Sequence, residues 1–415
     1  MQKKLIVLAV AAALTAPTLA LADNANITFY GKAHVSLDSN NGNAGTIGTT
    51  GTKNGLNLTS NSSRFGLKGS EDLGDGLNAI YQYETEVLAQ GGNSLLGAQR
   101  DTYVGVKGSL GSLVAGRLPL ANMYANDANF MGDKIGDAGN MTAGGFGGNG
   151  AIAVPSRAGR AIGYVSPAFS GMTVTAGFVP NTAQSLSGSI PAGTTPAGNN
   201  FTGGATQNQV DKASSFALRA AYDQDGIFAA VNYVNLGVAG INVASGGVTA
   251  GAPVGSTLAV AGAKVTVASL AGGYDFGIAQ VRAQYVLSDA NAAAAGSLVG
   301  APTGMKQGVF TLGGQYNVTE TSAIKAQVAQ AGDVTRSGTT LANSGATLMA
   351  LDYDYSLSKR TTVYAAYAKV SNKTNAAFSA TGYAHGGVGS PQSNPVVAGV
   401  GYSPSALSVG VIHNF

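Results

Sequence analysis

Apolar and polar residues alternate along most of the chain, in stretches of about ten residues separated by Gly, Asp, Asn or Ser. The segment 26–38 shows this most clearly. Its two alternating sets are Ile27, Phe29, Gly31, Ala33, Val35 and Leu37, and Thr28, Tyr30, Lys32, His34, Ser36 and Asp38. A period of two places successive side chains on opposite faces of a β-strand. The pattern therefore predicts strands with one apolar face and one polar face.

Sixteen segments are expected to form such strands. They are 26–38, 62–71, 77–88, 99–108, 112–118, 159–166, 171–180, 213–222, 226–236, 264–274, 278–288, 306–316, 321–331, 347–356, 360–370 and 404–415. Tight-turn sequences such as Gly74-Asp75-Gly76 alternate with long loops rich in Gly, Ser, Thr, Asn and Ala. Short turns at one rim and long loops at the other are typical of membrane barrels. Because sequence patterns place strand ends only to within about two to four residues, counts of fourteen or eighteen strands stay open.

Charged residues make up only 10% of the chain, although 45% of its residues are hydrophobic. A soluble domain typically carries about 25% charged residues, so much of the outer surface is expected to avoid water. Beyond the N-terminus no continuous apolar run reaches the roughly 18 residues of a membrane helix. In hydrocarbon only helices and closed barrels pair all their backbone groups. We therefore predict an all-β fold, a transmembrane antiparallel β-barrel of sixteen strands.

The N-terminal segment has the features of a secretory signal peptide. Lys3 and Lys4 form a basic region, residues 5–14 an apolar core, and Ala20-Leu21-Ala22 a small-residue cleavage site. We expect residues 1–22 to be removed on export, so that the mature chain starts at Asp23. Residues 23–415 are then expected to form a single barrel domain.

Catalytic, metal-binding and nucleic-acid functions find little support in the residues. The chain has no Cys, and its histidines, His34, His385 and His413, have no evident acidic partner in sequence. The net charge of +3 is too small to indicate a nucleic-acid partner. We therefore expect no enzyme activity, no metal site, no cofactor and no nucleic-acid partner.

The last predicted strand carries a further pattern. One of its faces consists of apolar and aromatic residues, Leu407, Val409, Val411, His413 and Phe415. An alternating strand that ends in an aromatic residue is the signature we associate with outer-membrane barrels, in which the barrel-assembly machinery reads it. This pattern predicts that machinery as a partner.

Several blocks of sequence resemble one known family. They are residues 27–32 (ITFYGK), 63–77 (SRFGLKGSEDLGDGL), 100–107 (RDTYVGVK), 116–118 (GRL), 163–167 (GYVSP), 354–361 (DYSLSKRT) and 411–415 (VIHNF). In these blocks the chain is similar to the general porins of Gram-negative bacteria, in particular to neisserial and other betaproteobacterial porins. The likeness spans the mature chain and is weakest between residues 181 and 305.

The resemblance implies a sixteen-stranded homotrimeric barrel whose third long loop folds into the pore. That loop would be 119–156, and its acids would be Asp127, Asp133 and Asp137. The facing basic wall would contain Arg64, Arg100, Arg157 and Arg160, to which alternation adds Lys32 and Lys68. The lumen position of Arg100 rests on the resemblance alone. The loop departs from the family pattern, because it is Gly-rich at 144–150 and lacks an acidic Pro-Glu-Phe-like block.

The expected function is that of an outer-membrane general diffusion porin, a passive, water-filled channel for small hydrophilic solutes and ions that contacts outer-membrane lipid. A barrel of about sixteen strands is too wide for side chains to fill, and charges on its inner face bias the passage of solutes. The alternative is a substrate-specific channel or an adhesin that binds through the loops 181–212 and 237–263. Those loops contain few aromatic residues, which argues against tight ligand binding there.

Overall fold

The computed structural model describes most of the predicted barrel. The described residues are 26–41, 55–87, 96–120, 123–142, 156–180, 214–238, 241–244, 257–260, 263–291, 304–381 and 401–415. The predicted signal peptide and the loop 181–212 lie outside them, as does most of the loop 237–263. In the described part of the chain, no helix is both long enough and apolar enough to cross a membrane.

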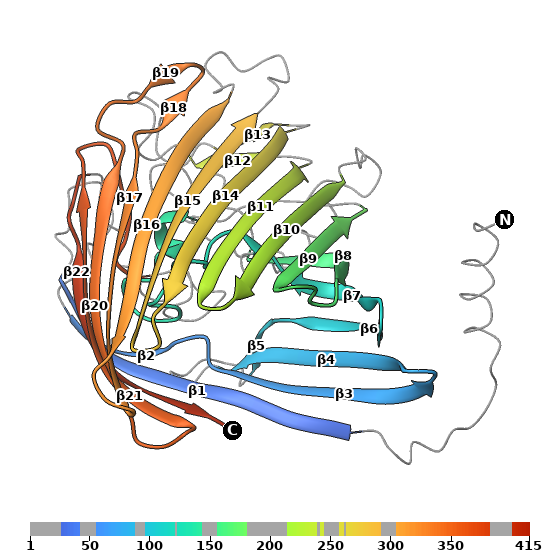
Figure 1. Cartoon of the computed structure of the whole chain (residues 1–415). Coiled ribbons are helices and arrows are strands. Elements are labelled where there is room, and N and C mark those ends of the chain that lie inside the picture. The colour runs from blue at the N-terminus through green and yellow to red at the C-terminus, as the bar shows by residue number, and fades with distance from the viewer. Residues whose placement is uncertain are drawn as a thin grey trace.

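One antiparallel sheet curls round until its first and last strands pair (Figure 1). Its strands are β1 (Asn26–Asn41), β2 (Gly55–Ser60), β3 (Arg64–Gly74), β4 (Leu77–Val87), β5 (Leu96–Gln99), β6 (Thr102–Gly108), β7 (Gly111–Pro119), β8 (Arg157–Val165), β9 (Met172–Val179), β10 (Ser215–Gln224), β11 (Ile227–Val238), β14 (Ala263–Asp275), β15 (Ala279–Asn291), β16 (Met305–Asn317), β17 (Ser322–Ala331), β18 (Thr335–Arg336), β19 (Thr339–Thr340), β20 (Ala346–Ser356), β21 (Thr361–Asn372) and β22 (Ser405–Asn414). A separate hairpin joins β12 (Ile241–Ala244) to β13 (Thr257–Val260).

The sheet contains sixteen strand positions, as the sequence predicted. Both β2 and β3 pair with β1, so they follow each other in one position, and β5 and β6 likewise share the position beside β4. The short strand β18 continues β17 along the edge of β16, and β19 pairs only with β18. The second predicted strand, expected to start at residue 62, instead begins at Gly55, because β2 continues it.

On most strands the two faces differ in chemistry as predicted. On β1, Phe29 is 65% exposed on the outer side, whereas His34 and Asp38 are fully buried on the inner side. Tyr83, Tyr233, Tyr285 and Tyr355 are all exposed on the outer side, which is typical of the aromatic girdles of membrane barrels. The barrel therefore presents apolar side chains outward and polar side chains inward, the reverse of a soluble protein.

The tight turns at one rim follow directly from their residues. Asp75 and Gly76 join β3 to β4 with φ angles of 51° and 75°, and Asp225 and Gly226 join β10 to β11 with φ angles of 55° and 79°. Positive φ at both central positions is the geometry of a two-residue hairpin turn, which Asp-Gly adopts readily. These turns fix the register, and hence the face on which each side chain lies.

The barrel closes where β22 pairs with β1, from Lys32 opposite Asn414 to Asn41 opposite Ser405. At the end of this seam Gly31 N donates a hydrogen bond to Phe415 O (2.9 Å), and Phe415 N donates to Gly31 O (3.1 Å). The Phe415 ring covers Gly31 so closely that a Cβ atom there would lie 2.3 Å from the ring and 2.8 Å from the carbonyl oxygen of Arg64. Glycine at position 31 is thus required for this closure.

We expect Gly31→Ala to destabilise the folded barrel by about 1–3 kcal/mol, because the added methyl group must displace the Phe415 ring and strain the β1–β3 pairing. The measurement is urea unfolding of the purified protein in detergent. Ala33→Val, which enlarges an exposed side chain two residues further along the outer face of β1, is the control. A Gly31→Ala protein as stable as the unsubstituted one would contradict this account of the seam.

Candidate functional site

Residues 123–142, from the third long loop, lie against the inner wall of the barrel. Gln284 of β15 donates a hydrogen bond through Nε2 to Tyr124 O (2.6 Å). Two strands along the same wall, Gln327 of β17 accepts a bond from Phe130 N (2.8 Å) and donates one to Gly136 O (2.6 Å). Both glutamines belong to the inward-facing, buried set of their strands. The loop is therefore fixed at points on two separate strands.

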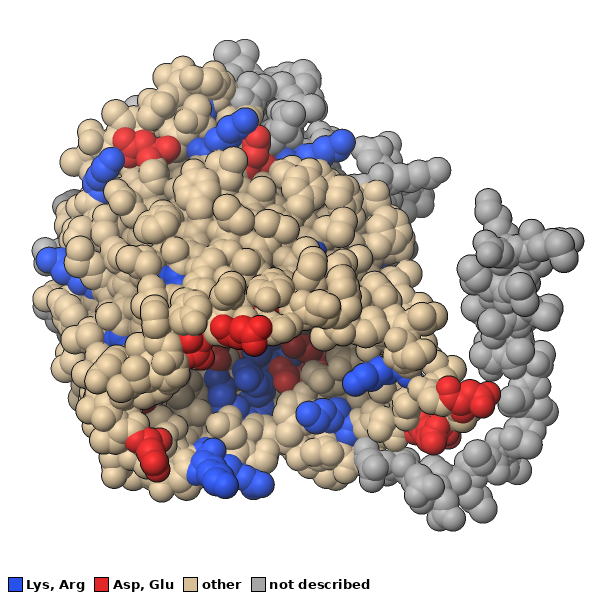
Figure 2. Space-filling model, viewed as in Figure 1, with Lys and Arg blue, Asp and Glu red and all other residues tan. Residues whose placement is uncertain are grey.

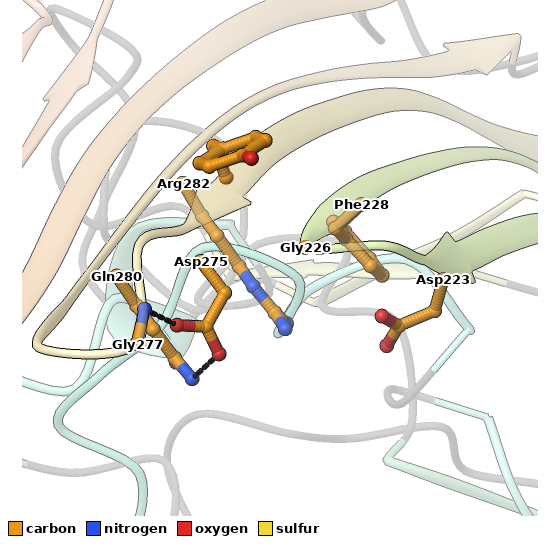
Figure 3. Close-up of a pocket in the computed structure, with 8 residues that line it drawn as sticks. Asp223, Gly226, Phe228, Asp275, Gly277, Gln280 and Arg282 are labelled. Carbon is orange, nitrogen blue, oxygen red and sulfur yellow. Dashed lines mark hydrogen bonds between the residues drawn. The ribbon is translucent and has the colours of Figure 1, made fainter.

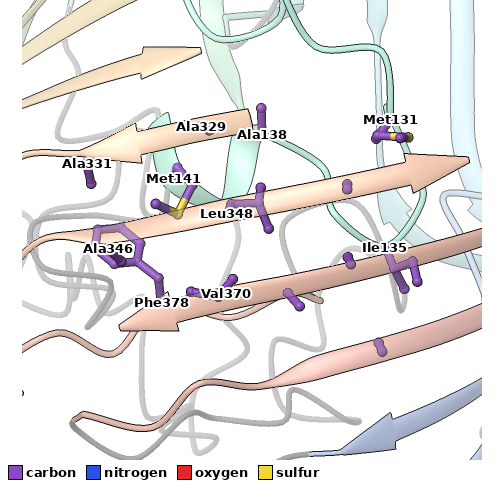
Figure 4. Close-up of a cluster of buried hydrophobic side chains, with 14 of the residues drawn as sticks. Met131, Ile135, Ala138, Met141, Ala329, Ala331, Ala346, Leu348, Val370 and Phe378 are labelled. Atoms are coloured by element: carbon purple, nitrogen blue, oxygen red, sulfur yellow. The ribbon is translucent and has the colours of Figure 1, made fainter. Parts of the chain in front are cut away.

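An apolar cluster holds the loop against β17, β20 and β21 (Figure 4). The loop supplies Met131, Ile135 and Met141, the last from the short helix α2 (Gly139–Thr142). The wall supplies small or aliphatic inward-facing side chains, Ala329, Ala331, Ala346, Leu348, Ala350, Ala366, Ala368 and Val370. The small alanine side chains leave room for the loop, whereas larger side chains would fill that space. On these strands the inner face of the barrel is therefore apolar rather than polar.

A buried lysine forms an ionic contact between the loop and this wall. Lys134 Nζ lies 2.6 Å from Asp352 Oδ2 and also pairs with Asp354, both on β20. The same ammonium lies 4.2 Å from the centroid of the Tyr364 ring on β21. The Lys134 side chain is 4% exposed and that of Asp352 is fully buried, so each depends on the other to offset the cost of leaving water.

On the other side of the lumen, Asp127 binds the guanidinium of Arg219 on β10. Two contacts of 2.7 and 2.8 Å make the pair bidentate. Asn232 of β11 bonds to both partners. A bidentate pair fixes orientation as well as distance, so the start of the loop is held on β10 and β11.

Basic side chains of the first strands meet the tip of the loop. Asp133 pairs with Lys32 of β1 and lies 3.7 Å from Arg64 of β3. Burial alone would raise the pKa of Asp133, but Lys32 and then Arg64 and Arg100 outweigh it and hold the pKa below its usual value. The fold thus stabilises the ionised form of Asp133, and ionised Asp133 in turn contributes to the stability of the folded protein. That stabilisation is lost as the pH falls through the lowered pKa.

Glu84 of β4 connects Arg64 to Arg100. Its carboxylate lies 2.5 Å from Arg100 Nε and 3.9 Å from Arg64 Nε, and it accepts a hydrogen bond from the Tyr30 hydroxyl (3.0 Å). Lys32, Arg64, Arg100, Glu84 and Asp133 therefore form one network, which we call the basic wall cluster. Figure 2 shows Lys and Arg side chains gathered inside the opening of the barrel.

The remaining predicted site residues do not belong to that cluster. Arg157 pairs with Asp101 at 2.5 Å, and Lys68 lies over the Tyr30 ring. Arg160 is exposed beside the register shift in β8 and has a φ angle of 53°. Asp137 turns into its own loop, where it accepts bonds from Gly139 N (2.7 Å) and Asn129 Nδ2 (2.7 Å). Burial raises the pKa of Asp137 to about 6, with the hydrogen bonds to its carboxylate acting in the opposite direction.

The sequence interpretation missed the wall partners of the loop, namely Arg219, Asp352 and Asp354. All three lie in strands that were correctly placed, and alternation assigns Arg219 and Asp352 to the polar face with Asn232 and Gln327. That signal identifies inward-facing charges. It carries no information on which of them a loop residue reaches.

Comparisons with known proteins identify one family. A family model described as Gram-negative porin matches residues 8–375. The chain is 29% identical over 234 residues to the major outer membrane protein P.IB of Neisseria meningitidis serogroup A, a match that covers 53% of this chain and 68% of the relative. It is 32% identical over 200 residues to P.IA of Neisseria meningitidis serogroup B, where the match covers 43% of this chain and only 47% of the relative.

Among solved structures, the fold is similar to that of an anion-selective porin from Comamonas acidovorans. The TM-score is 0.66 at 20% sequence identity, and the match covers 94% of this chain and all of that one. Identity this low supports the shared fold and nothing finer. The sixteen-stranded closed barrel predicted from the sequence is thereby confirmed.

The buried lysine gives a test of how the loop is held. We expect Lys134→Met to lower the free energy of unfolding by about 3–5 kcal/mol, because it leaves the buried carboxylate of Asp352 with no ion-pair partner within 4.0 Å among the described residues. Adding Asp352→Asn should recover part of that loss. Lys306→Met, which breaks an exposed pair with Asp289, is the matched control and should change little. Equal effects of Lys134→Met and Lys306→Met on detergent-solubilised protein would contradict the proposed anchoring.

Proposed function

The chain belongs to the Gram-negative porin family, and on that premise we propose that it is a general diffusion channel of the outer membrane, passive and water-filled, for small hydrophilic solutes and ions. The observation that carries the proposal is the closed barrel of sixteen strand positions with polar side chains on its inner face. A barrel of that size encloses more space than inward side chains can fill. Transport through it would need no energy input.

We further propose that the third loop and the basic wall cluster form the narrowest part of the channel. Support comes from the loop contacts on β10, β15, β17 and β20, which carry the loop across the lumen. Lys32, Arg64 and Arg100 would act on passing ions together with Asp133 and Glu84. Asp127, Arg157, Lys68, Arg160 and Asp137 would act less directly, since most are paired elsewhere or turned away. Charges that line a constriction bias ion selectivity.

Subunit association is a finer proposal. We propose a homotrimer, as the family resemblance implies. The strands β6, β7, β8 and β9 span only seven to nine residues, whereas β14, β15 and β16 each span thirteen. A lower wall on one side is suited to contact with another protein subunit rather than with lipid of full thickness. The native mass of the solubilised protein tests this directly.

Planar-bilayer recording tests the channel proposal. We expect stable, near-ohmic conductance steps from the purified protein in plain salt. In a salt gradient, Arg64→Gln should shift the reversal potential toward cation preference and Asp133→Asn toward anion preference, because each removes one charge from the basic wall cluster. Lys306→Met, outside that cluster, is the control. A correctly folded protein without conductance steps would show that the channel proposal is wrong.

The predicted signal peptide gives a separate prediction. We propose that residues 1–22 are removed during export, because the basic, apolar and small-residue regions follow in the order of a signal peptide. Mass spectrometry of protein extracted from outer membranes should find Asp23 as the first residue. Extracted protein that retains residues 1–22 would contradict cleavage at this site.

A further inference from the structure

A cavity of about 430 Å³ opens at the short-turn end of the barrel, and none of its lining residues belongs to the basic wall cluster. Its lining comes from β10, β11, β14 and β15 (Figure 3). The charged and polar members are Asp223, Asp275, Gln280 and Arg282, and Phe228 forms an apolar surface among them. Cavities that bind small molecules commonly combine one apolar surface with a few polar groups in this way.

The strand register places the main residues of this cavity in a single row. Asp223 of β10 lies opposite Phe228 of β11, Phe228 opposite Gly273 of β14, and Gly273 opposite Arg282 of β15. Phe228 belongs to the inward-facing set of its strand and is 8% exposed. The row therefore runs across four neighbouring strands on the inner wall.

Gly273 allows Arg282 to reach Phe228. A Cβ atom at position 273 would lie 2.5 Å from Cγ of Arg282 and 2.4 Å from the carbonyl oxygen of Val281. With glycine there, the arginine side chain crosses the neighbouring strand, and its guanidinium carbon lies 4.1 Å from the centroid of the Phe228 ring. A cation over an aromatic face is attracted to it, so the arginine is held in place by a ring rather than by a carboxylate.

The guanidinium of Arg282 is consequently available for a ligand. Among the described residues it forms no ion pair within 4.0 Å, in contrast to Arg64, Arg100, Arg157 and Arg219. Figure 3 shows it between Asp275 on one side and Asp223 and Phe228 on the other. The carboxylate of Asp275 is oriented by Gly277 N and by Gln280 Nε2, each at 2.7 Å.

We propose that this cavity is a weak binding site for small zwitterionic solutes of the free amino acid class, a proposal that rests on the lumen being an open channel. The solute carboxylate would accept hydrogen bonds from the free edge of Arg282, and its ammonium group would lie toward Asp223, on one side of the guanidinium, with Asp275 on the other side. A simple anion would meet two carboxylates, and a simple cation would meet the guanidinium. Only a solute with both charges satisfies both sides of the cavity.

The site is positioned to act on solutes that enter or leave at the short-turn mouth. A channel site must hold a solute long enough to favour entry and weakly enough to release it. An open cavity with one guanidinium and two carboxylates fits that requirement better than an enclosed one. The site would raise the local concentration of zwitterions at this mouth without blocking ion flow.

Saturation-transfer NMR on the purified, detergent-solubilised protein tests the proposal, with L-alanine as the probe. Propionate and ethylamine, which each lack one of the two charged groups, are the comparison solutes. We expect L-alanine to bind more tightly than either. Arg282→Gln and Asp223→Asn should each weaken its binding about tenfold, the loss typical of one charged hydrogen-bond partner.

Asp225→Asn is the matched control. It removes the same charge two residues from Asp223, on the adjacent turn but outside the cavity lining, and Asn tolerates the positive φ of that position. Unchanged L-alanine binding in Arg282→Gln, or equal losses in Asp223→Asn and Asp225→Asn, would overturn the site. All variants should keep normal conductance in plain salt, which separates failure of this site from failure of the channel itself.

Discussion

The whole structure depends on the need to pair every backbone N–H and C=O group where no water is present. In hydrocarbon an open sheet edge would leave a row of unpaired groups, so the first and last strands must meet. The β1–β22 register and the close contact of Gly31 with Phe415 accomplish this. Once the sheet is closed, the period of two along each strand decides the direction of every side chain, since one set must contact lipid and the other must face the lumen.

Closure also leaves a wide space inside the barrel, which the third loop partly fills. A loop can occupy part of this space only where the side chains of the wall provide room and favourable contacts. Alanines on β17, β20 and β21 provide an apolar seat, and Lys134 adds a buried ionic contact to Asp352. Asp127 and Asp133 hold the loop to opposite sides of the barrel, on Arg219 and on Lys32. The loop acids therefore hold the loop in place, in addition to placing charge inside the barrel.

The sequence predicted the barrel better than the site because alternation is a local signal and loop docking is not. Strand positions, turns and the facing of His34 or Phe29 follow from residues a few positions apart. The extension of the second strand to Gly55 was missed, because the segment 39–61 is polar and Gly-rich like a loop. The partnership of Asp127 with Arg219 joins residues 92 positions apart, and no spacing rule reaches that far. The orientation of the Asp137 side chain toward its own loop likewise depends on the folded path of that loop.

The central claim is that each strand has one lipid face and one water face, and the absence of native cysteine allows a direct test. Single cysteines can be introduced on β16 by Leu312→Cys, on the outer side, and by Gln315→Cys, on the inner side. In lipid vesicles, a membrane-impermeant thiol reagent should label only Gln315→Cys, and a lipid-dissolved reagent only Leu312→Cys. Labelling of both positions by the water-soluble reagent, or the reverse pattern, would contradict the account.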